Sequence, residues 1–339
     1  MIACPVTTGV LRHLLGGRLT GDEGVTISGV SEVATAEPCD VICASHSEQQ
    51  LLATCRAGLL LAGEGTTALP GGVSAVLAVR DPESALDWCR RYFRARAEVL
   101  RGECVAADDG VLVGAGCSIG AGATVGAWCV LFPGACVAPG AVLGAGCVVR
   151  PRAVLASSVE IGARCEIGAG AVIGSECERY EPGRDAWRRT PGSGSVVIGD
   201  DVSIGPLTVI EKGFRENTRI GSGSILGGQV YISHDCTVGT SCLIIGQSGL
   251  ASGVAVGDAA ALMARVAVNS NVRIGDGALV FAGSGVFGDV PPHAQVLGHP
   301  ARPRRQALRA MALPRQVEAL RLRLARMEKQ DSASKGAGA

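Results

Sequence analysis

The sequence predicts a mainly β fold, in which a left-handed parallel β-helix of hexapeptide repeats carries a small N-terminal α/β domain and a C-terminal helix. An aliphatic residue stands at every sixth position over 113–173, 198–210 and, after a slip of four residues, 220–286. This period is that of neither a helix nor an ordinary strand, and it fits short parallel strands joined by tight turns. The 339 residues include 49 Gly, and only 3% are aromatic although 47% are hydrophobic. The core must therefore be built from small and β-branched side chains.

Residues 1–103 lack the hexad and form the predicted N-terminal domain. Alternating runs such as VTISGVS and VSAVLAV indicate strands, and TTGVLRHLLGG and PESALDWCRRYFRARAEVL indicate helices. This mixture predicts a small α/β domain. The β-helix domain is predicted to follow over 104–292.

Two segments depart from the repeat. Residues 174–195 are polar and contain Gly and Pro, so they predict a loop insertion, and a loop this long in a compact repeat is often functional. Residues 293–339 are basic at first, and their apolar side chains predict a helix that self-associates. Four apolar residues follow a/d spacing there: Val317, Leu320, Leu324 and Met327. The final DSASKGAGA predicts a disordered tail.

Composition limits the classes of function. The formal net charge is 0, which gives no indication of nucleic-acid binding. No apolar run reaches the ~18 residues of a membrane span, and the N-terminus lacks a signal-peptide pattern. We therefore expect a cytoplasmic protein without stable membrane insertion. Free thiols can fill the small corners of the repeat, and six of the 14 cysteines stand there: Cys117, Cys129, Cys147, Cys165, Cys236 and Cys242.

The stretch YISHDCTVG, residues 231–239, contains the single histidine of the five that falls within the hexads, His234. An imidazole titrates near neutrality and can act as a general base. The same residue stands two positions after Ile232, at a turn where Asp, Asn or His often occurs, as Asp200 does after Ile198. Its position alone leaves a structural and a catalytic role open.

Several long motifs, in order along the chain, resemble the UDP-3-O-acylglucosamine N-acyltransferases of lipid A biosynthesis. They are LLGGRLTGDEGVTISGVSEVATAEPCDV near the N-terminus, GSVVIGDDVSIGPLTVIEKGFRENTRIG, VYISHDCTVG, and GDVPPHAQVLGHPARPRRQALR at the end of the repeat. The resemblance covers nearly the whole chain. It implies a homotrimer that binds no cofactor and takes its acyl group from the phosphopantetheine thioester of acyl carrier protein, although the residues themselves leave acyl-coenzyme A open as the donor. It also implies that His234 is the general base acting on the sugar's amine.

The chain departs from this family in the nucleotide site. The family holds the uracil ring with an aromatic residue, an asparagine and a tyrosine, and the corresponding positions here are Cys43, His46 and Gln49. A Gly- and Phe-rich turn of the family becomes GSECERYEPG, which leaves Glu178 and Tyr180 as candidate substrate-binding residues. The acceptor is therefore expected to differ from the family's.

The catalytic motif departs as well. Seven residues before the histidine the family carries an aspartate that orients the imidazole, and Gly227 stands there in this chain. The adjacent Asp235 is the candidate substitute. A second family histidine corresponds to Asn271, a further candidate for substrate binding. The resemblance also suggests that Arg302, Arg304 and Arg305 dock the acidic carrier protein, although such a charge run is also typical of a solvated helix face.

Four functions remain open from the sequence. The first is an acyltransferase that kept the acyl-transfer machinery and moves an acyl group to an amine of an amino sugar or related small acceptor. The second is a decayed homologue that acts as a trimeric scaffold, and the third is a true lipid A N-acyltransferase. The fourth, a hexapeptide carbonic anhydrase, needs three metal-binding histidines, and a single histidine in the hexads disfavours it. Fold alone does not decide among them.

Overall fold

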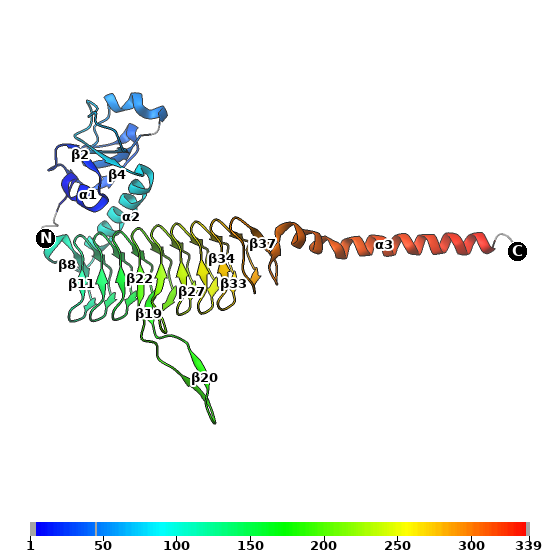
Figure 1. Ribbon diagram of the computed structural model, residues 1–339. Helices are drawn as coiled ribbons and strands as arrows, with labels where there is room; N and C mark the ends of the chain where they lie inside the picture. Colours follow the sequence, from blue (N-terminus) through cyan, green and yellow to red (C-terminus); the bar gives the residue numbers. More distant parts are fainter. Residues whose placement is uncertain (1–4, 45, 337–339) are drawn as a thin grey trace.

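The computed structural model describes residues 5–44 and 46–336, and its centre is a three-faced prism of parallel strands (Figure 1). Successive strands along the chain pass from one face to the next, so each coil adds one strand to each of three sheets. Strands within a sheet pair in register, with Cys136 opposite both Ser118 and Val154. The fold is the left-handed parallel β-helix that the six-residue period predicts.

The three sheets contain nine, eight and twelve strands. The first comprises β10 (Ser118–Ile119), β13 (Cys136–Val137), β16 (Val154–Leu155), β19 (Val172–Ser175), β24 (Val209–Glu211), β27 (Tyr231–Ile232), β30 (Gly249–Leu250), β33 (Ala267–Val268) and β36 (Gly285–Val286). The second comprises β11 (Thr124–Val125), β14 (Val142–Leu143), β17 (Glu160–Ile161), β22 (Val196–Ile198), β25 (Thr218–Ile220), β28 (Thr237–Val238), β31 (Ala255–Val256) and β34 (Arg273–Ile274).

The third sheet closes both ends of the prism. It comprises β8 (Cys104–Ala106), β9 (Leu112–Gly114), β12 (Val130–Leu131), β15 (Val148–Val149), β18 (Glu166–Ile167), β23 (Ser203–Ile204), β26 (Ile225–Leu226), β29 (Leu243–Ile244), β32 (Ala261–Leu262), β35 (Leu279–Val280), β37 (Gln295–Leu297) and β38 (Arg302–Pro303). Its end pairs, β8 with β9 and β37 with β38, are antiparallel. Since β37 pairs with β35, the sheet continues past residue 292, where the sequence places the end of the repeat domain.

The recurring aliphatic side chains fill the interior of the prism, and most of them are buried. The exceptions are in the first coil, where Val113 and Val125 are half-buried and Ile119 is 46% exposed, because β10 and β11 are edge strands with no coil beyond them. Five of the six corner cysteines are buried and Cys117 is half-buried. Their thiols donate to backbone carbonyls of the next coil, as Cys147 does to Gly162 at 3.2 Å and Cys242 to Gly257 at 3.0 Å. These cysteines are core residues.

The N-terminal domain has a five-stranded sheet in the order β2 (Arg18–Gly21), β7 (Ala75–Val79), β6 (Leu59–Gly63), β5 (Asp40–Cys43) and β4 (Gly29–Val30). Only β2 is antiparallel to its neighbour. A second pair is β1 (Val6–Thr7) with β3 (Thr26–Ile27). The helices are α1 (Thr8–Leu15), α2 (Pro82–Leu100) and the short 3₁₀ turns η1 (Val33–Thr35), η2 (His46–Ala53) and η3 (Asp108–Gly110).

Helix α2 joins this domain to the prism. Asp81 caps its N-terminus by accepting from the N–H of Ser84 at 3.1 Å, and Pro82 occupies the first turn. Trp88 and Tyr92 stack with ring centroids 4.7 Å apart, and both belong to a buried cluster that includes residues of β9, β12 and β15, which lie in three successive coils of the prism. A salt bridge of 3.0 Å between Glu98 and Arg150 crosses the same junction.

The two interruptions of the repeat lie side by side. Residues 174–195, predicted as a loop, contain an antiparallel hairpin of β20 (Tyr180–Pro182) and β21 (Trp187–Arg189) that projects from the prism (Figure 1). The backbone of 193–195 bonds to that of 213–214, within the four-residue slip. Gly213 permits this turn, because a Cβ there would overlap the carbonyl oxygen of Glu216. The chain thus concentrates its irregular backbone on one side of the prism.

Helix α3 (Arg304–Gly336) leaves the far end of the prism (Figure 1). Its predicted a/d residues are all exposed: Val317 at 52%, Leu320 at 58%, Leu324 at 57% and Met327 at 56%. The helix continues to Gly336, whereas the sequence predicts a disordered tail from 331; Ala, Ser and Lys do not stop a helix. The last three residues lie outside the described chain. Within the part described, no helix is long and apolar enough to cross a membrane.

Candidate active site

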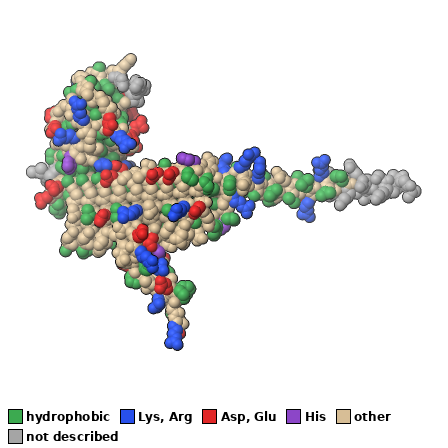
Figure 2. Space-filling model, viewed as in Figure 1, with side chains coloured by type: hydrophobic (Ala, Val, Ile, Leu, Met, Phe, Trp, Pro, Cys, Tyr) green, Lys and Arg blue, Asp and Glu red, His purple; other side chains and the backbone are tan. Residues whose placement is uncertain are grey.

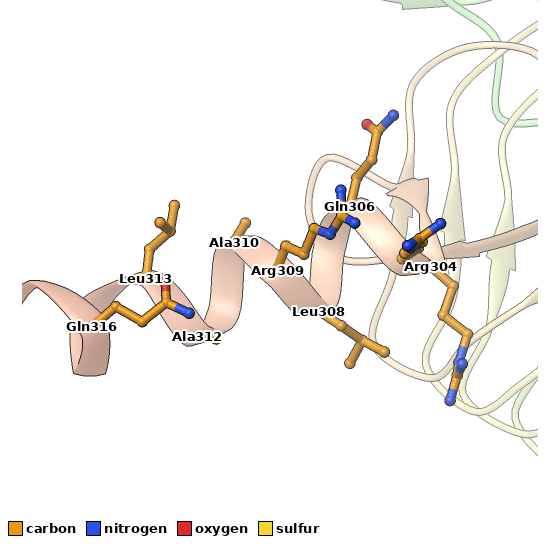
Figure 3. A pocket seen from close by; sticks show the side chains of 9 residues that line it. Arg304, Gln306, Leu308, Arg309, Ala310, Ala312, Leu313 and Gln316 are labelled. Atoms are coloured by element: carbon orange, nitrogen blue, oxygen red, sulfur yellow. The ribbon is translucent and has the colours of Figure 1, made fainter.

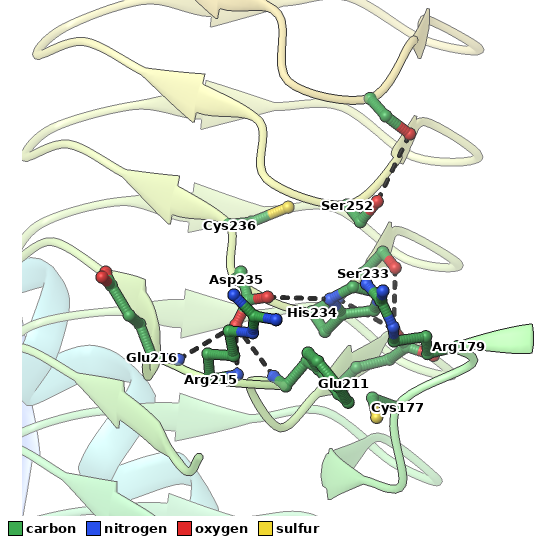
Figure 4. A network of polar contacts seen from close by, with 12 residues as sticks. Cys177, Arg179, Glu211, Arg215, Glu216, Ser233, His234, Asp235, Cys236 and Ser252 are labelled. Atoms are coloured by element: carbon green, nitrogen blue, oxygen red, sulfur yellow. Dashed lines mark hydrogen bonds and ion pairs between the residues drawn. The ribbon is translucent and has the colours of Figure 1, made fainter. Parts of the chain in front are cut away.

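His234 occupies the corner between β27 and β28. Ile232 points into the prism, and the next residues turn outward, with Asp235 at a left-handed φ of 60° that aspartate tolerates. The sequence suggests that His234 projects outward, but its exposed fraction is only 6%. The slip segment lies beside it: the Phe214 ring is 6.1 Å from the imidazole, centroid to centroid, and Arg215 and Glu216 of the same segment donate their N–H groups to Asp235 (Figure 4). The imidazole is therefore held in a largely desolvated corner.

Asp235 is the direct partner of the imidazole. Its Oδ2 lies 3.1 Å from Nδ1 of His234, and its Oδ1 accepts from the N–H groups of Phe214, Arg215 and Glu216 at 2.8, 3.1 and 3.2 Å. Partial burial alone would raise the pKa of Asp235, but the bond to His234 and the three N–H donors together hold it below its ordinary value. A carboxylate facing Nδ1 favours the tautomer with the proton there, which leaves Nε2 unprotonated.

Glu211 is a site residue that the sequence analysis missed. Its side chain is fully buried, and it accepts four hydrogen bonds. Oε1 accepts from the hydroxyl of Tyr231 at 2.6 Å and the N–H of Glu178 at 2.7 Å. Oε2 accepts from the hydroxyl of Ser233 at 2.7 Å and the N–H of His234 at 2.8 Å. The sequence does contain a sign of it, because Glu211 directly follows the core residue Ile210 and no other hexad has an acid at that position.

A pocket of about 460 Å³ opens beside His234. Its floor lies along residues that are paired across neighbouring strands of the nine-stranded sheet. Tyr231 pairs with Gly249, and Gly249 pairs with Ala267. A Cβ at Gly249 would meet nothing within 4 Å, so these paired residues form an open trough. Burial, and then the bond to Glu211, raise the pKa of Tyr231. The lining comprises Glu178, Tyr231, Ser233, His234, Gly249, Leu250, Ala251, Ser252, Ala267, Val268 and Ser270.

Residues 140–175 match the family described as bacterial transferase hexapeptide (six repeats).

Curated relatives of this chain include UDP-3-O-acylglucosamine N-acyltransferases from two species. This chain is 41% identical over 54 residues to the one from Neisseria gonorrhoeae (strain ATCC 700825 / FA 1090). It is 45% identical over 56 residues to the one from Colwellia psychrerythraea. Each match covers 16% of this chain and 16% of the relative. The likeness to these enzymes is therefore local, and it does not extend to their whole length.

Solved structures share the fold over a longer stretch. LpxA from Acinetobacter baumannii superposes with a TM-score of 0.52 at 22% identity, over 56% of this chain and 72% of that chain. UDP-N-acetylglucosamine acyltransferase from Campylobacter jejuni superposes with a TM-score of 0.51 at 24% identity, over the same shares. At such identities the likeness establishes the hexapeptide β-helix and nothing finer.

The start of the hairpin segment, Glu178 and Arg179, is called the hairpin base here, and it borders the pocket. Glu178 lines the pocket, and the guanidinium of Arg179 lies 4.3 Å from the centroid of the Phe214 ring. Tyr180, the other candidate from this segment, is 52% exposed on β20 and does not line the pocket. The structure therefore places Glu178, but not Tyr180, beside His234.

The remaining candidates lie elsewhere on the hexapeptide prism or beyond it. Asn271 stands at a corner two coils from His234, since the N–H of Gly253 bonds to the carbonyl of His234 and that of Asn271 to the carbonyl of Ser252. Cys43 ends β5 in the N-terminal domain and is half-buried. His46 and Gln49 follow in η2, but their side chains lie outside the described part of the structure.

The three basic candidates stand where α3 leaves the prism (Figure 2). Arg302 lies in β38, and the guanidinium of Arg304 lies 5.5 Å from the ring of Phe281. Arg304 and Arg305 line a hollow of about 890 Å³ along the start of α3, together with Arg309 and Leu313 (Figure 3). This basic surface, residues 302–309, is well separated along the chain's long axis from the N-terminal domain (Figure 1).

Proposed function

We propose that the chain is an acyltransferase that moves an acyl group from the thioester of acyl carrier protein to an amine, with His234 as general base. The observation that carries the proposal is the His234–Asp235 pair, 3.1 Å apart, at the edge of a pocket on a hexapeptide prism. Hexapeptide acyltransferases among the curated and solved relatives support the class of reaction.

The proposed mechanism follows from this geometry. The acceptor amine attacks the thioester carbonyl while Nε2 of His234 removes its proton. The Asp235 carboxylate stabilises the imidazolium that forms and keeps Nδ1 protonated. The tetrahedral intermediate then collapses, the carbon–sulfur bond breaks, and His234 returns the proton to the departing thiolate. The products are an amide and the free phosphopantetheine thiol, so no bound cofactor or metal takes part in the proposed step.

The pocket supports a small, basic acceptor. Glu178 lines it close to His234, and a carboxylate there suits an ammonium group before deprotonation. The hydroxyls of Ser252 and Ser270, 3.3 Å apart, offer further polar contacts such as a sugar needs. We propose Glu178 as an acceptor-binding residue, with Tyr180 and Asn271 reaching the acceptor only if a neighbouring subunit brings them to it. Cys43, His46 and Gln49 are proposed to contact the more distant end of the acceptor.

We propose that the working form is a homotrimer, with the exposed a/d residues of α3 packed between subunits. Exposed apolar stripes of this kind are typical of coiled-coil partners. The basic surface 302–309 is the proposed dock for the acidic carrier protein, through Arg302, Arg304 and Arg305. Since acylated carrier protein is cytoplasmic, the proposal places the reaction in the cytoplasm.

A panel experiment tests the proposal. Wild-type chain is mixed with acylated carrier protein and a set of amino sugars and simpler amines, and amide products are measured in a single turnover. The proposal expects at least one amine to be acylated. No product on a broad panel would favour a trimeric scaffold instead, whereas preference for a UDP-linked amino sugar would favour a lipid A N-acyltransferase.

A further inference from the structure

The Glu211 carboxylate joins three separate segments of the chain. It lies at the end of β24, and its four donors come from the hairpin base at Glu178 and from Tyr231, Ser233 and His234 around the catalytic corner. In the part of the chain described, it forms no ion pair within 4.0 Å, and Lys212 beside it pairs with Glu176 at 2.6 Å instead. A buried carboxylate without a cation is costly unless its lone pairs are filled, as they are here.

Each oxygen of Glu211 holds one donor that can rotate and one that cannot. Oε1 takes the Tyr231 hydroxyl and the backbone N–H of Glu178, and Oε2 takes the Ser233 hydroxyl and the backbone N–H of His234. The two fixed donors belong to two residues that line the pocket, Glu178 of the hairpin segment and His234 of the corner. Because these two N–H groups bond to the two oxygens of one carboxylate, Glu211 sets the distance between the backbone at Glu178 and the backbone at His234.

We infer that Glu211 is a positioning residue that fixes His234 relative to the hairpin side of the acceptor pocket. The inference rests on the proposed function for its effect on rate, but not for its effect on structure. A role in stability alone would be met more simply by a small apolar residue, as most hexads have after their core aliphatic residue. The acid is retained where the repeat is interrupted and the histidine lies.

Replacing Glu211 by glutamine tests the hydrogen bonds of the carboxylate without changing the size of the side chain. Glu211→Gln keeps the size of the side chain but replaces one oxygen by an NH₂ group, which can only donate. The hydroxyls of Tyr231 and Ser233 can turn to accept from it, but a backbone N–H cannot. The variant must therefore release either the amide of Glu178 or the amide of His234. Both outcomes change the spacing across the pocket.

Two readouts follow from this release. Amide hydrogen exchange, measured by mass spectrometry, should become faster in peptides spanning either 176–180 or 231–236. In acyl transfer, kcat should fall about 10²-fold with the donor KM within about twofold, because misplacement of a base by about 1 Å has that cost. Glu211→Asp keeps both oxygens and should retain more activity than Glu211→Gln. The matched control is Glu176→Gln, whose carboxylate is exposed and lies outside the pocket lining, and which should behave as wild type.

The outcomes separate this inference from the proposed function. A folded Glu211→Gln with wild-type exchange and wild-type kcat would overturn the positioning role, even if the wild type acylates an amine. If Glu211→Gln exchanges faster but the wild type acylates no amine, the positioning role of Glu211 is supported and the proposed acyltransferase activity is contradicted. If Glu211→Gln does not fold, Ser233→Ala replaces it, since it removes one donor from Oε2 beside His234. Faster exchange over 231–236 is then expected, and unchanged exchange contradicts the inference.

Discussion

The Nδ1 atom of His234 lies 3.1 Å from Oδ2 of Asp235, its neighbour in sequence. Adjacent residues seldom face each other in a strand, because successive side chains point to opposite sides. Here the left-handed backbone of Asp235, with φ at 60°, turns the corner of the coil and brings its carboxylate back to the imidazole. Gly227 has no side chain that could contact the imidazole. The carboxylate of Asp235, the residue after His234, makes that contact instead.

Asp235→Asn should lower kcat roughly 10²–10⁴-fold in a chain that still folds and assembles. An asparagine amide facing Nδ1 favours the wrong tautomer, with the proton on Nε2 where the base is needed. Single-turnover acyl transfer measures the change. Asp258→Asn is the matched control, since Asp258 is also a corner carboxylate and accepts from the N–H of Thr240 at 2.7 Å, away from the histidine. Equal rates in the two variants would count against the pair.

Asp235 should also contribute to acid sensitivity. Its pKa lies below the ordinary 3.8 in the folded chain, so folding favours the carboxylate. This contribution is complete above the pKa of the unfolded state and is lost as pH falls through the lower, folded pKa. Melting temperatures measured from pH 5 downward should therefore fall less steeply in Asp235→Asn than in wild type. A parallel fall would mean that the hydrogen bonds to Asp235 add nothing to stability.

The chain should sediment as a trimer at micromolar concentration. The apolar stripe of α3 is more than half exposed in a single chain, with Leu320 at 58% and Leu324 at 57%, and such a stripe needs partners. Replacing both leucines by glutamate should weaken the assembly in sedimentation velocity. A stable wild-type monomer would contradict the proposed homotrimer.

Uridine nucleotides should bind weakly or not at all. Stacking of a base on an aromatic ring is worth ~1–3 kcal/mol, and Cys43 offers no ring. Burial and then the carboxylates of Glu83 and Glu48 raise the pKa of the Cys43 thiol. Calorimetry with a UDP-sugar checks the prediction. Low-micromolar affinity would contradict it and favour a lipid A N-acyltransferase.

The fold was predictable because the repeat is strictly periodic. A residue such as Leu143 or Ile244 has one possible place, the interior of the prism, once the period of six is recognised. The cysteine corners followed from the same rule. Periodicity also located His234 at a corner, although it could not indicate how deeply that corner is buried.

The site was harder to predict because it is built where the period fails. Phe214 lies beside His234 in the slip segment, and the backbone of that segment bonds to residues 193–195, about twenty positions earlier in the chain. Glu211 was visible as an acid out of place in the repeat, but its four partners come from tertiary structure. No spacing rule links 178, 211 and 234.

The most direct test of the account is single-turnover acyl transfer by His234→Ala, with melting and sedimentation as controls for folding and assembly. His293→Ala is the matched variant, because His293 is another histidine at a corner of the prism and is exposed outside the pocket. We predict that His234→Ala loses roughly 10²–10⁴-fold in rate while His293→Ala keeps the wild-type rate. Equal transfer by His234→Ala and wild type would contradict the proposed mechanism.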